Sequence, residues 1–137
     1  MDNIIIKKIW EDEGLIELRI TAISEYVTAY QDCYIDVEKL SDISTEICSY
    51  SYNYNENCKV QFGEESEEYT PSFSMTILKA DMNGRVKIEV NIYVDDSENN
   101  HMCCYYIKSE LGCLQRFGEE LKKLASVSID DSIQLNN

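Results

Sequence analysis

The sequence predicts an α+β fold, in which an antiparallel β-sheet meander carries two helices packed on one face and leaves its other face open. Three observations support this class. Several segments alternate apolar and polar residues, two segments repeat apolar residues every three or four positions, and successive strands are joined by hairpin turns. A chain of 137 residues with 44% hydrophobic content is long enough to bury a core, so we expect a single domain over residues 1–137.

The N-terminal part of the chain is expected to form three strands. The runs IIIKKIW and LIELRITAIS flank the acidic turn EDEG around Gly14, which is typical of a hairpin. The next run, YVTAYQDCYI, alternates in the same way and places Tyr26, Tyr30 and Tyr34 on the face opposite to Cys33. This third strand therefore presents a row of tyrosines to one side of the sheet.

A helix is expected where the period changes at Asp36. Apolar residues then recur every three or four positions as far as Tyr50, which predicts a helix from about 37 to 50, with the Asp36 carboxylate capping its first turn. The tyrosine-rich stretch SYSYNYNENC begins at the end of this helix and continues as a loop. The segment CKVQFG predicts a short strand over 58–63, followed by the acidic loop EESEE.

The clearest alternation follows, in SFSMTILKA and RVKIEVNIYV, which flank the turn DMNG. Asn83 and Gly84 tolerate the positive φ angles of a tight turn, so these runs predict a hairpin. HMCCYYIK predicts the next strand, and Ser109 is expected to open a helix whose apolar stripe ends at Leu124. Two glycines inside this helix weaken it by about 1 kcal/mol each relative to alanine. Residues 126–137 form either a loose tail or a last short strand.

The formal net charge is −14, from 26 acidic and 12 basic residues. A field of this sign repels nucleic-acid backbones and anionic membrane surfaces, so we expect neither as a partner. It would speed the encounter with a basic protein, although it also suits a protein that only needs to stay soluble. Composition alone favours solubility as the explanation.

The location of the protein and the state of its cysteines can also be predicted. No apolar run reaches ~18 residues, and the first residues, MDNIIIKKIW, place an acid before a very short apolar stretch, which is the wrong order for a secretory signal. We therefore expect a cytoplasmic protein. In a reducing cytosol the six cysteines are expected to be free thiols rather than disulfides.

No residue pattern indicates an enzyme or a cofactor. The acidic clusters fall in predicted turns and loops, where carboxylates stay solvated and unsuited to acid–base catalysis. His101 and Cys103 share a strand face and are the nearest approach to a nucleophilic pair, but such a pair normally needs a cleft and a third orienting group. Cys103 and Cys104 point to opposite faces, which disfavours a shared metal ion, and phosphate-binding glycine loops are lacking.

What remains is a surface for binding a protein. Tyrosines supply large contact areas at interface centres, and acids are common at the rim. The alternative is that the rings only cover the sheet as cross-strand aromatic pairs, and the sequence leaves this open. The candidate partner-binding residues are Tyr26, Tyr30, Tyr34, Tyr93, Glu64, Glu65, Glu67, Glu68, Asp95 and Asp96.

The layout also resembles a known family. An early strand meander, the helix DVEKLSDISTEICSY, the short strand VQFG, the hairpin SFSMTILKADMNGRVKIEVNIYV and the closing helix ELGCLQRFGEELKKL are similar to small bacterial immunity proteins. The likeness is greatest to the WapI-like immunity proteins of polymorphic or contact-dependent toxin systems. It covers roughly residues 12 to 125 and depends on pattern and layout rather than on a motif.

The resemblance implies a cytoplasmic protein that binds a cognate toxin domain, often a nuclease, and neutralises it by occlusion without catalytic residues. The acidic composition fits, because a nuclease surface that binds RNA or DNA is basic. Two alternatives stay open: an acidic scaffold or regulator without a toxin partner, and a small enzyme that uses His101.

Overall fold

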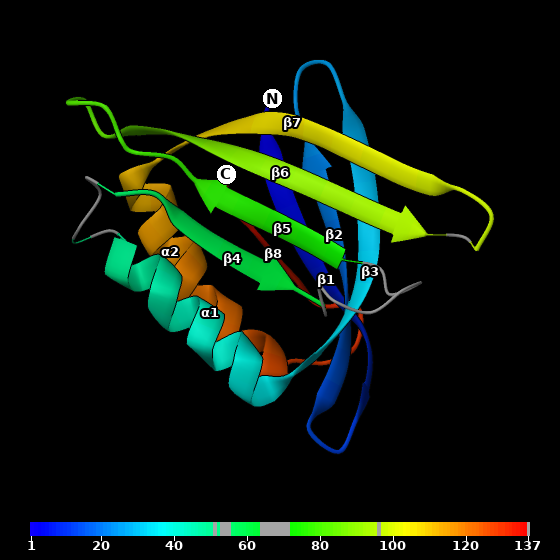
Figure 1. The fold of residues 1–137 in the computed structure, drawn as a ribbon. Helices are drawn as coiled ribbons and strands as arrows, with labels where there is room; N and C mark the ends of the chain where they lie inside the picture. Colours follow the sequence, from blue (N-terminus) through cyan, green and yellow to red (C-terminus); the bar gives the residue numbers. More distant parts are fainter. Residues whose placement is uncertain (51, 53–55, 64–71, 96, 137) are drawn as a thin grey trace.

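The strands pair into two antiparallel sheets, which face one another across a shared core (Figure 1). The computed structural model describes residues 1–50, 52, 56–63, 72–95 and 97–136, and for Val94 and Asp95 it describes the backbone only. The elements are β1 (Asn3–Asp12), β2 (Leu15–Ile23), β3 (Thr28–Asp36), α1 (Val37–Tyr50), β4 (Cys58–Phe62), β5 (Ser72–Ile77), β6 (Arg85–Asp95), β7 (Asn100–Glu110), α2 (Leu111–Leu121), a 3₁₀ turn (Lys122–Ala125) and β8 (Ser132–Gln134).

The α+β class and the antiparallel pairing expected from the sequence are confirmed, but the strands do not form one continuous meander. One sheet has the strand order β3-β2-β1-β8 and the other has the order β4-β5-β6-β7. The chain leaves the edge of the first sheet through α1, so β4 begins a second sheet instead of extending the first. Each sheet therefore has its own outer face.

The core lies between the inner faces of the sheets and is closed on one side by the helices. In Figure 1 the β4–β7 sheet crosses in front of β1, β2 and β3, while α1 and α2 lie side by side at the lower left. Leu18 of β2, Phe73 of β5 and Phe117 of α2 are all fully buried in one cluster. The alternation of each strand is what turns these side chains inward.

Helix α1 begins and ends as the sequence predicts. The Asp36 carboxylate accepts a 2.7 Å hydrogen bond from the backbone N–H of Lys39, which satisfies one of the free amides of the first turn. At the other end Tyr50 is buried, and its hydroxyl donates a 2.6 Å hydrogen bond to the carbonyl oxygen of Leu78. Tyr50 is thus the last core contact of the helix.

Helix α2 starts later than expected, because Ser109 still belongs to β7 and Glu110 occupies the N-cap with extended backbone angles. Instead of capping the helix, the Ser109 hydroxyl donates a 2.8 Å hydrogen bond to the side-chain oxygen of Asn136. The helices meet closely at Gly118, whose carbonyl oxygen accepts a 2.5 Å hydrogen bond from the Ser44 hydroxyl. This glycine, which weakens the helix by itself, permits the close approach of α1.

The C-terminal segment ends in the short strand that was one of the two alternatives. Strand β8 pairs antiparallel with β1, and Ile133 lies opposite Ile6. The fully buried side chain of Lys8 also holds the segment, because its ammonium donates to the carbonyl oxygens of Val127 at 2.9 Å and Ala125 at 3.3 Å. Its charge is balanced by Glu11, whose carboxylate oxygen lies 2.6 Å away.

Candidate functional site

The outer face of the first sheet carries a group of exposed aromatic side chains, called here the aromatic face. Tyr30 and Tyr34 project outward from β3 and are 59% and 56% exposed, as the alternation of the strand predicts. Trp10 on β1 is 39% exposed on the same side. Tyr26 lies in the turn before β3, not in the strand as expected, and is 87% exposed. The aromatic face consists of Trp10, Arg19, Tyr30 and Tyr34.

Trp10 reaches this face because of a β-bulge. In a regular strand Trp10 would point to the same side as Lys8, two residues earlier, which is buried in the interior. The pairing register shifts between Lys8 and Trp10, so that Lys8 lies opposite Leu18 but Trp10 lies opposite Glu17. The bulge turns the indole outward, and the sequence contains no turn residue that marks it.

The Trp10 and Tyr34 rings make direct contact across the middle strand. Their centroids are 5.8 Å apart and their planes meet at 87°, the edge-to-face arrangement that aromatic quadrupoles prefer. The two residues belong to β1 and β3, and Glu17 of β2 lies between them in the register. The pair holds two large rings in fixed positions on an open surface.

Arg19 contacts both Asp32 and Tyr30 at the end of the aromatic face away from Trp10. Its guanidinium donates two hydrogen bonds to Asp32, at 2.8 and 3.0 Å, and these residues lie directly opposite each other on β2 and β3. The guanidinium carbon is also 4.9 Å from the centroid of the Tyr30 ring, which is cation–π distance. The hydrogen bonds that Arg19 donates to Asp32, together with the negative charge of Asp32, raise the pKa of Arg19 above its ordinary value. Sequence periodicity indicated the tyrosines but missed this arginine.

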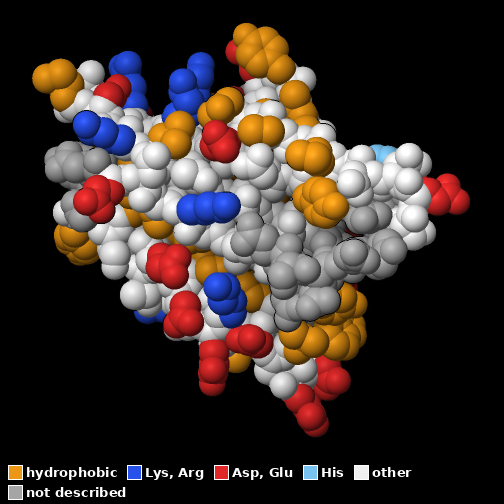
Figure 2. Space-filling view, in the orientation of Figure 1, with side chains coloured by type: hydrophobic (Ala, Val, Ile, Leu, Met, Phe, Trp, Pro, Cys, Tyr) orange, Lys and Arg blue, Asp and Glu red, His pale blue; other side chains and the backbone are white. Residues whose placement is uncertain are grey.

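Acidic side chains border the aromatic face at the end that contains Trp10. The tip of the β1–β2 hairpin carries Glu11, Asp12 and Glu13, all exposed, and the exposed Asp36 ends the neighbouring edge strand β3. Figure 2 shows acidic side chains gathered at this lower tip of the molecule, with hydrophobic side chains just above them. The surface thus joins an aromatic centre to an acidic border.

The other predicted partner-binding residues are not part of this face. Tyr93 is half-buried on the outer side of β6, in the second sheet, opposite Ser72 and Met102. Asp95 ends β6, where only its backbone is described. Outside the described residues lie Glu64, Glu65, Glu67, Glu68 and Asp96. Of the predicted set, the structure therefore brings together only Tyr30 and Tyr34, on the outer side of β3.

The residues considered for catalysis lie on β7. His101 is exposed opposite Val94, and Cys103 is half-buried against the core opposite Ile92. All six cysteines are free thiols. Within the described ranges no three histidine, cysteine or acidic side chains are grouped closely enough to hold a metal ion. None of these residues contributes to the aromatic face.

Comparisons of the chain with protein-family models, with curated proteins and with solved structures find no match in any of the three. Among the helices in the described part of the chain, none combines the length and the apolar character needed to cross a membrane.

Proposed function

We propose that this protein is an immunity-type binding protein, which uses the aromatic face to occlude a basic toxin domain. The observation that carries the proposal is the set of side chains on the outer face of the first sheet. Tryptophan, tyrosine and arginine are the residue types most enriched at the energetic centres of protein interfaces. Here Trp10, Tyr34, Tyr30 and Arg19 share one open surface.

The fixed geometry of these side chains favours binding over a purely structural role. Binding normally costs about 0.5–1.5 kcal/mol for each long side chain that becomes ordered. The contact between Trp10 and Tyr34, and the stacking of Arg19 on Tyr30, order four of these side chains before a partner arrives. A partner therefore gains contact area with a reduced entropic penalty.

The charge distribution supports a basic partner. The acidic turn Glu11–Glu13 and Asp36 border the aromatic face, and the whole chain carries a net charge of −14. Such a field accelerates encounter with a positive surface and discourages acidic partners. Nuclease domains are basic because they bind phosphate backbones. Together with the resemblance to immunity proteins, this charge supports a toxin domain with a basic surface, such as a nuclease, as the natural partner.

The proposal predicts that a gene next to this one encodes the toxin domain, and the product of that gene is the partner used in the test. We expect co-expression to protect cells and the purified proteins to form a complex whose association rate falls as salt rises. Replacing Trp10 or Tyr34 by alanine should weaken the complex by about 2 kcal/mol or more, roughly thirtyfold, because each removes one ring of an exposed aromatic pair.

The matched control is Tyr106→Ala. Tyr106 is 46% exposed on the outer face of the second sheet. Its replacement therefore removes a ring about as exposed as Trp10, but from a surface outside the proposed interface. The Tyr106→Ala variant should leave the affinity for the toxin domain unchanged. Equal losses for Trp10→Ala and Tyr106→Ala would place the interface elsewhere, and a complex that gives no protection would favour the scaffold or regulator.

A further inference from the structure

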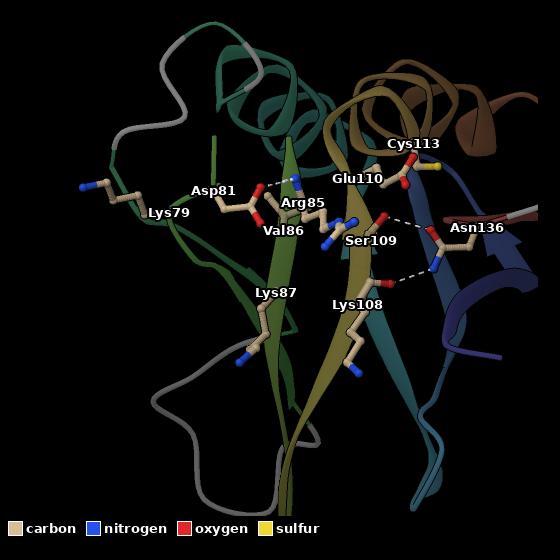
Figure 3. A pocket seen from close by; sticks show the side chains of 10 residues that line it. All are labelled: Lys79, Asp81, Arg85, Val86, Lys87, Lys108, Ser109, Glu110, Cys113 and Asn136. Atoms are coloured by element: carbon tan, nitrogen blue, oxygen red, sulfur yellow. Dashed lines mark hydrogen bonds between the residues drawn. The ribbon is translucent and has the colours of Figure 1, made fainter. Parts of the chain in front are cut away.

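A pocket of about 610 Å³ lies at the end of the second sheet where β6 begins and β7 ends. Figure 3 shows Arg85 extending from β6 toward Ser109 on β7, while Lys87 and Lys108 lie beside each other on the same two strands. Lys79 is at the margin of the pocket and points away from this group. The volume is in the range of about 300–1,000 Å³ that is usual for small-molecule sites.

The pocket is basic although the protein is strongly acidic. Four of the 12 basic residues of the chain line it, against two carboxylates, Asp81 and Glu110. Asp81 is already used by the turn before β6, because its carboxylate accepts hydrogen bonds from the backbone N–H groups of Asn83 at 2.8 Å and Arg85 at 3.0 Å. Figure 2 shows basic side chains along the upper left edge, where this end of the second sheet lies.

Lys87 and Lys108 are directly opposite each other on adjacent antiparallel strands. Like charges in this arrangement destabilise a sheet, so an anion bound beside both lysines would be stabilising. Lys8, Arg19 and Arg116 form ion pairs with acidic partners among the described residues, and Arg85, Lys87 and Lys108 take part in none of these three pairs. Lys87 has an aromatic neighbour instead, since its ammonium is 5.9 Å from the Tyr106 ring centroid.

The wall beside these cations is held by hydrogen bonds. The Asn136 side chain accepts from the Ser109 hydroxyl at 2.8 Å and donates to the carbonyl oxygen of Lys108 at 2.9 Å (Figure 3). The same amide group donates to the carbonyl oxygen of Asp2 at 2.9 Å. Residues near both chain ends thus hold the strand that carries Lys108.

We propose that this pocket binds the phosphate group of a small molecule. A dianionic phosphate would relieve the repulsion between Lys87 and Lys108, and its oxygens match the planar donor fork of Arg85. The size of the pocket favours a small molecule over a macromolecular surface. This site is independent of the proposed toxin interface, because it lies on the second sheet.

The test is an NMR titration of the intact, ¹⁵N-labelled protein with inorganic phosphate and with pyrophosphate, at ionic strength held constant with chloride. We expect saturable shifts for the amides of Lys87, Lys108 and Ser109, with pyrophosphate the tighter ligand. Acetate, a monoanion, should shift these amides far less. Comparable saturation by acetate would show general anion screening and overturn the proposal, as would an absence of saturable shifts.

Charge-removing variants provide the second measurement. Lys87→Gln and Lys108→Gln should each weaken pyrophosphate binding about tenfold, because each removes one charge-assisted contact. Lys123→Gln is the matched control, since Lys123 is an exposed lysine in the 3₁₀ turn outside the pocket. Lys108→Arg should retain binding. If Lys123→Gln weakened binding as much as Lys108→Gln, net charge rather than this pocket would be responsible.

Discussion

The hydroxyl of Tyr105 donates a 2.6 Å hydrogen bond to the carbonyl oxygen of Ala22 and thereby links the two sheets. Tyr105 belongs to β7 of the second sheet, and Ala22 to β2 of the first. The same hydroxyl oxygen accepts a 3.2 Å hydrogen bond from the backbone N–H of Ala29, which lies opposite Ala22 on β3. Burial raises the pKa of Tyr105 above its ordinary value, so the hydroxyl keeps its proton.

Tyr105→Phe should therefore destabilise the protein by about 1–3 kcal/mol, because it leaves polar backbone groups of the other sheet without their partner. Urea denaturation of the wild type and the variant measures this loss. Tyr106→Phe is the control, since the neighbouring hydroxyl bonds to Glu89 at the surface and its loss should cost less than about 0.5 kcal/mol. Equal losses would mean that the link between the sheets contributes nothing.

Gly118→Ala should destabilise the helix pair. The added Cβ would lie 2.9 Å from Cys48 Sγ and 3.0 Å from Ile47 Cγ2, so α1 and α2 would have to move apart. Overpacking of this kind costs about 1–3 kcal/mol, more than the roughly 1 kcal/mol that alanine gains in a helix. Thermal melting measures the difference. Gly112→Ala, in the same helix with open space around it, should instead raise the melting temperature.

Lys8→Met should loosen the C-terminal segment. The variant keeps the apolar stem but leaves the carbonyl oxygens of Ala125 and Val127 without their donor, at a cost of about 1–3 kcal/mol. Hydrogen exchange should become faster in residues 125–131 and stay unchanged in α1. Lys7→Met, one residue away on the outer side of β1, is the control. Unchanged exchange in Lys8→Met would show that β8 pairing alone holds the segment.

Alkaline pH should destabilise the protein through Cys33. Burial, with a smaller contribution from Asp32, raises the pKa of this thiol from 9.0 to about 12. Above pH 9 the unfolded chain loses the thiol proton while the folded protein keeps it, so stability is complete below about pH 9 and falls by roughly 1.4 kcal/mol per pH unit up to about 12. Cys33→Val should show a shallower fall when urea midpoints are compared between about pH 8 and 10.5. Parallel slopes would exclude Cys33 as the cause.

Local features of the fold were predictable from the sequence because short-range chemistry determines them. The cap at Asp36, the period change after it and the alternation in β3 each depend on neighbouring residues. The start of α2 was predicted wrongly because serine usually caps a helix, whereas the Ser109 hydroxyl bonds to Asn136, which is distant in sequence. The division into two sheets likewise depends on pairings between remote segments.

The candidate sites were predictable only in part, for the same reason. The outward direction of the β3 tyrosines followed from alternation. The outward direction of Trp10 did not, because it depends on the bulge, and the role of Arg19 did not, because it depends on the pairing of Arg19 with Asp32 on the next strand. The opposition of Lys87 and Lys108 follows from the β6–β7 register, which the sequence does not display. Where a function depends on residues brought together by register, a single sequence shows the residue types without showing that they meet.

The bulge in β1 affects how this surface can change during evolution. The bulge adds one residue to β1 between Lys8 and Trp10, and this turns Trp10 to the opposite face from Lys8. Loss or gain of a single codon there would therefore reverse which side chains face outward at the β1–β2 end of the strand. The strand before the bulge would keep its place in the core. A lineage under pressure to recognise a new partner therefore has a route to a different contact surface through one small insertion or deletion, besides gradual substitution.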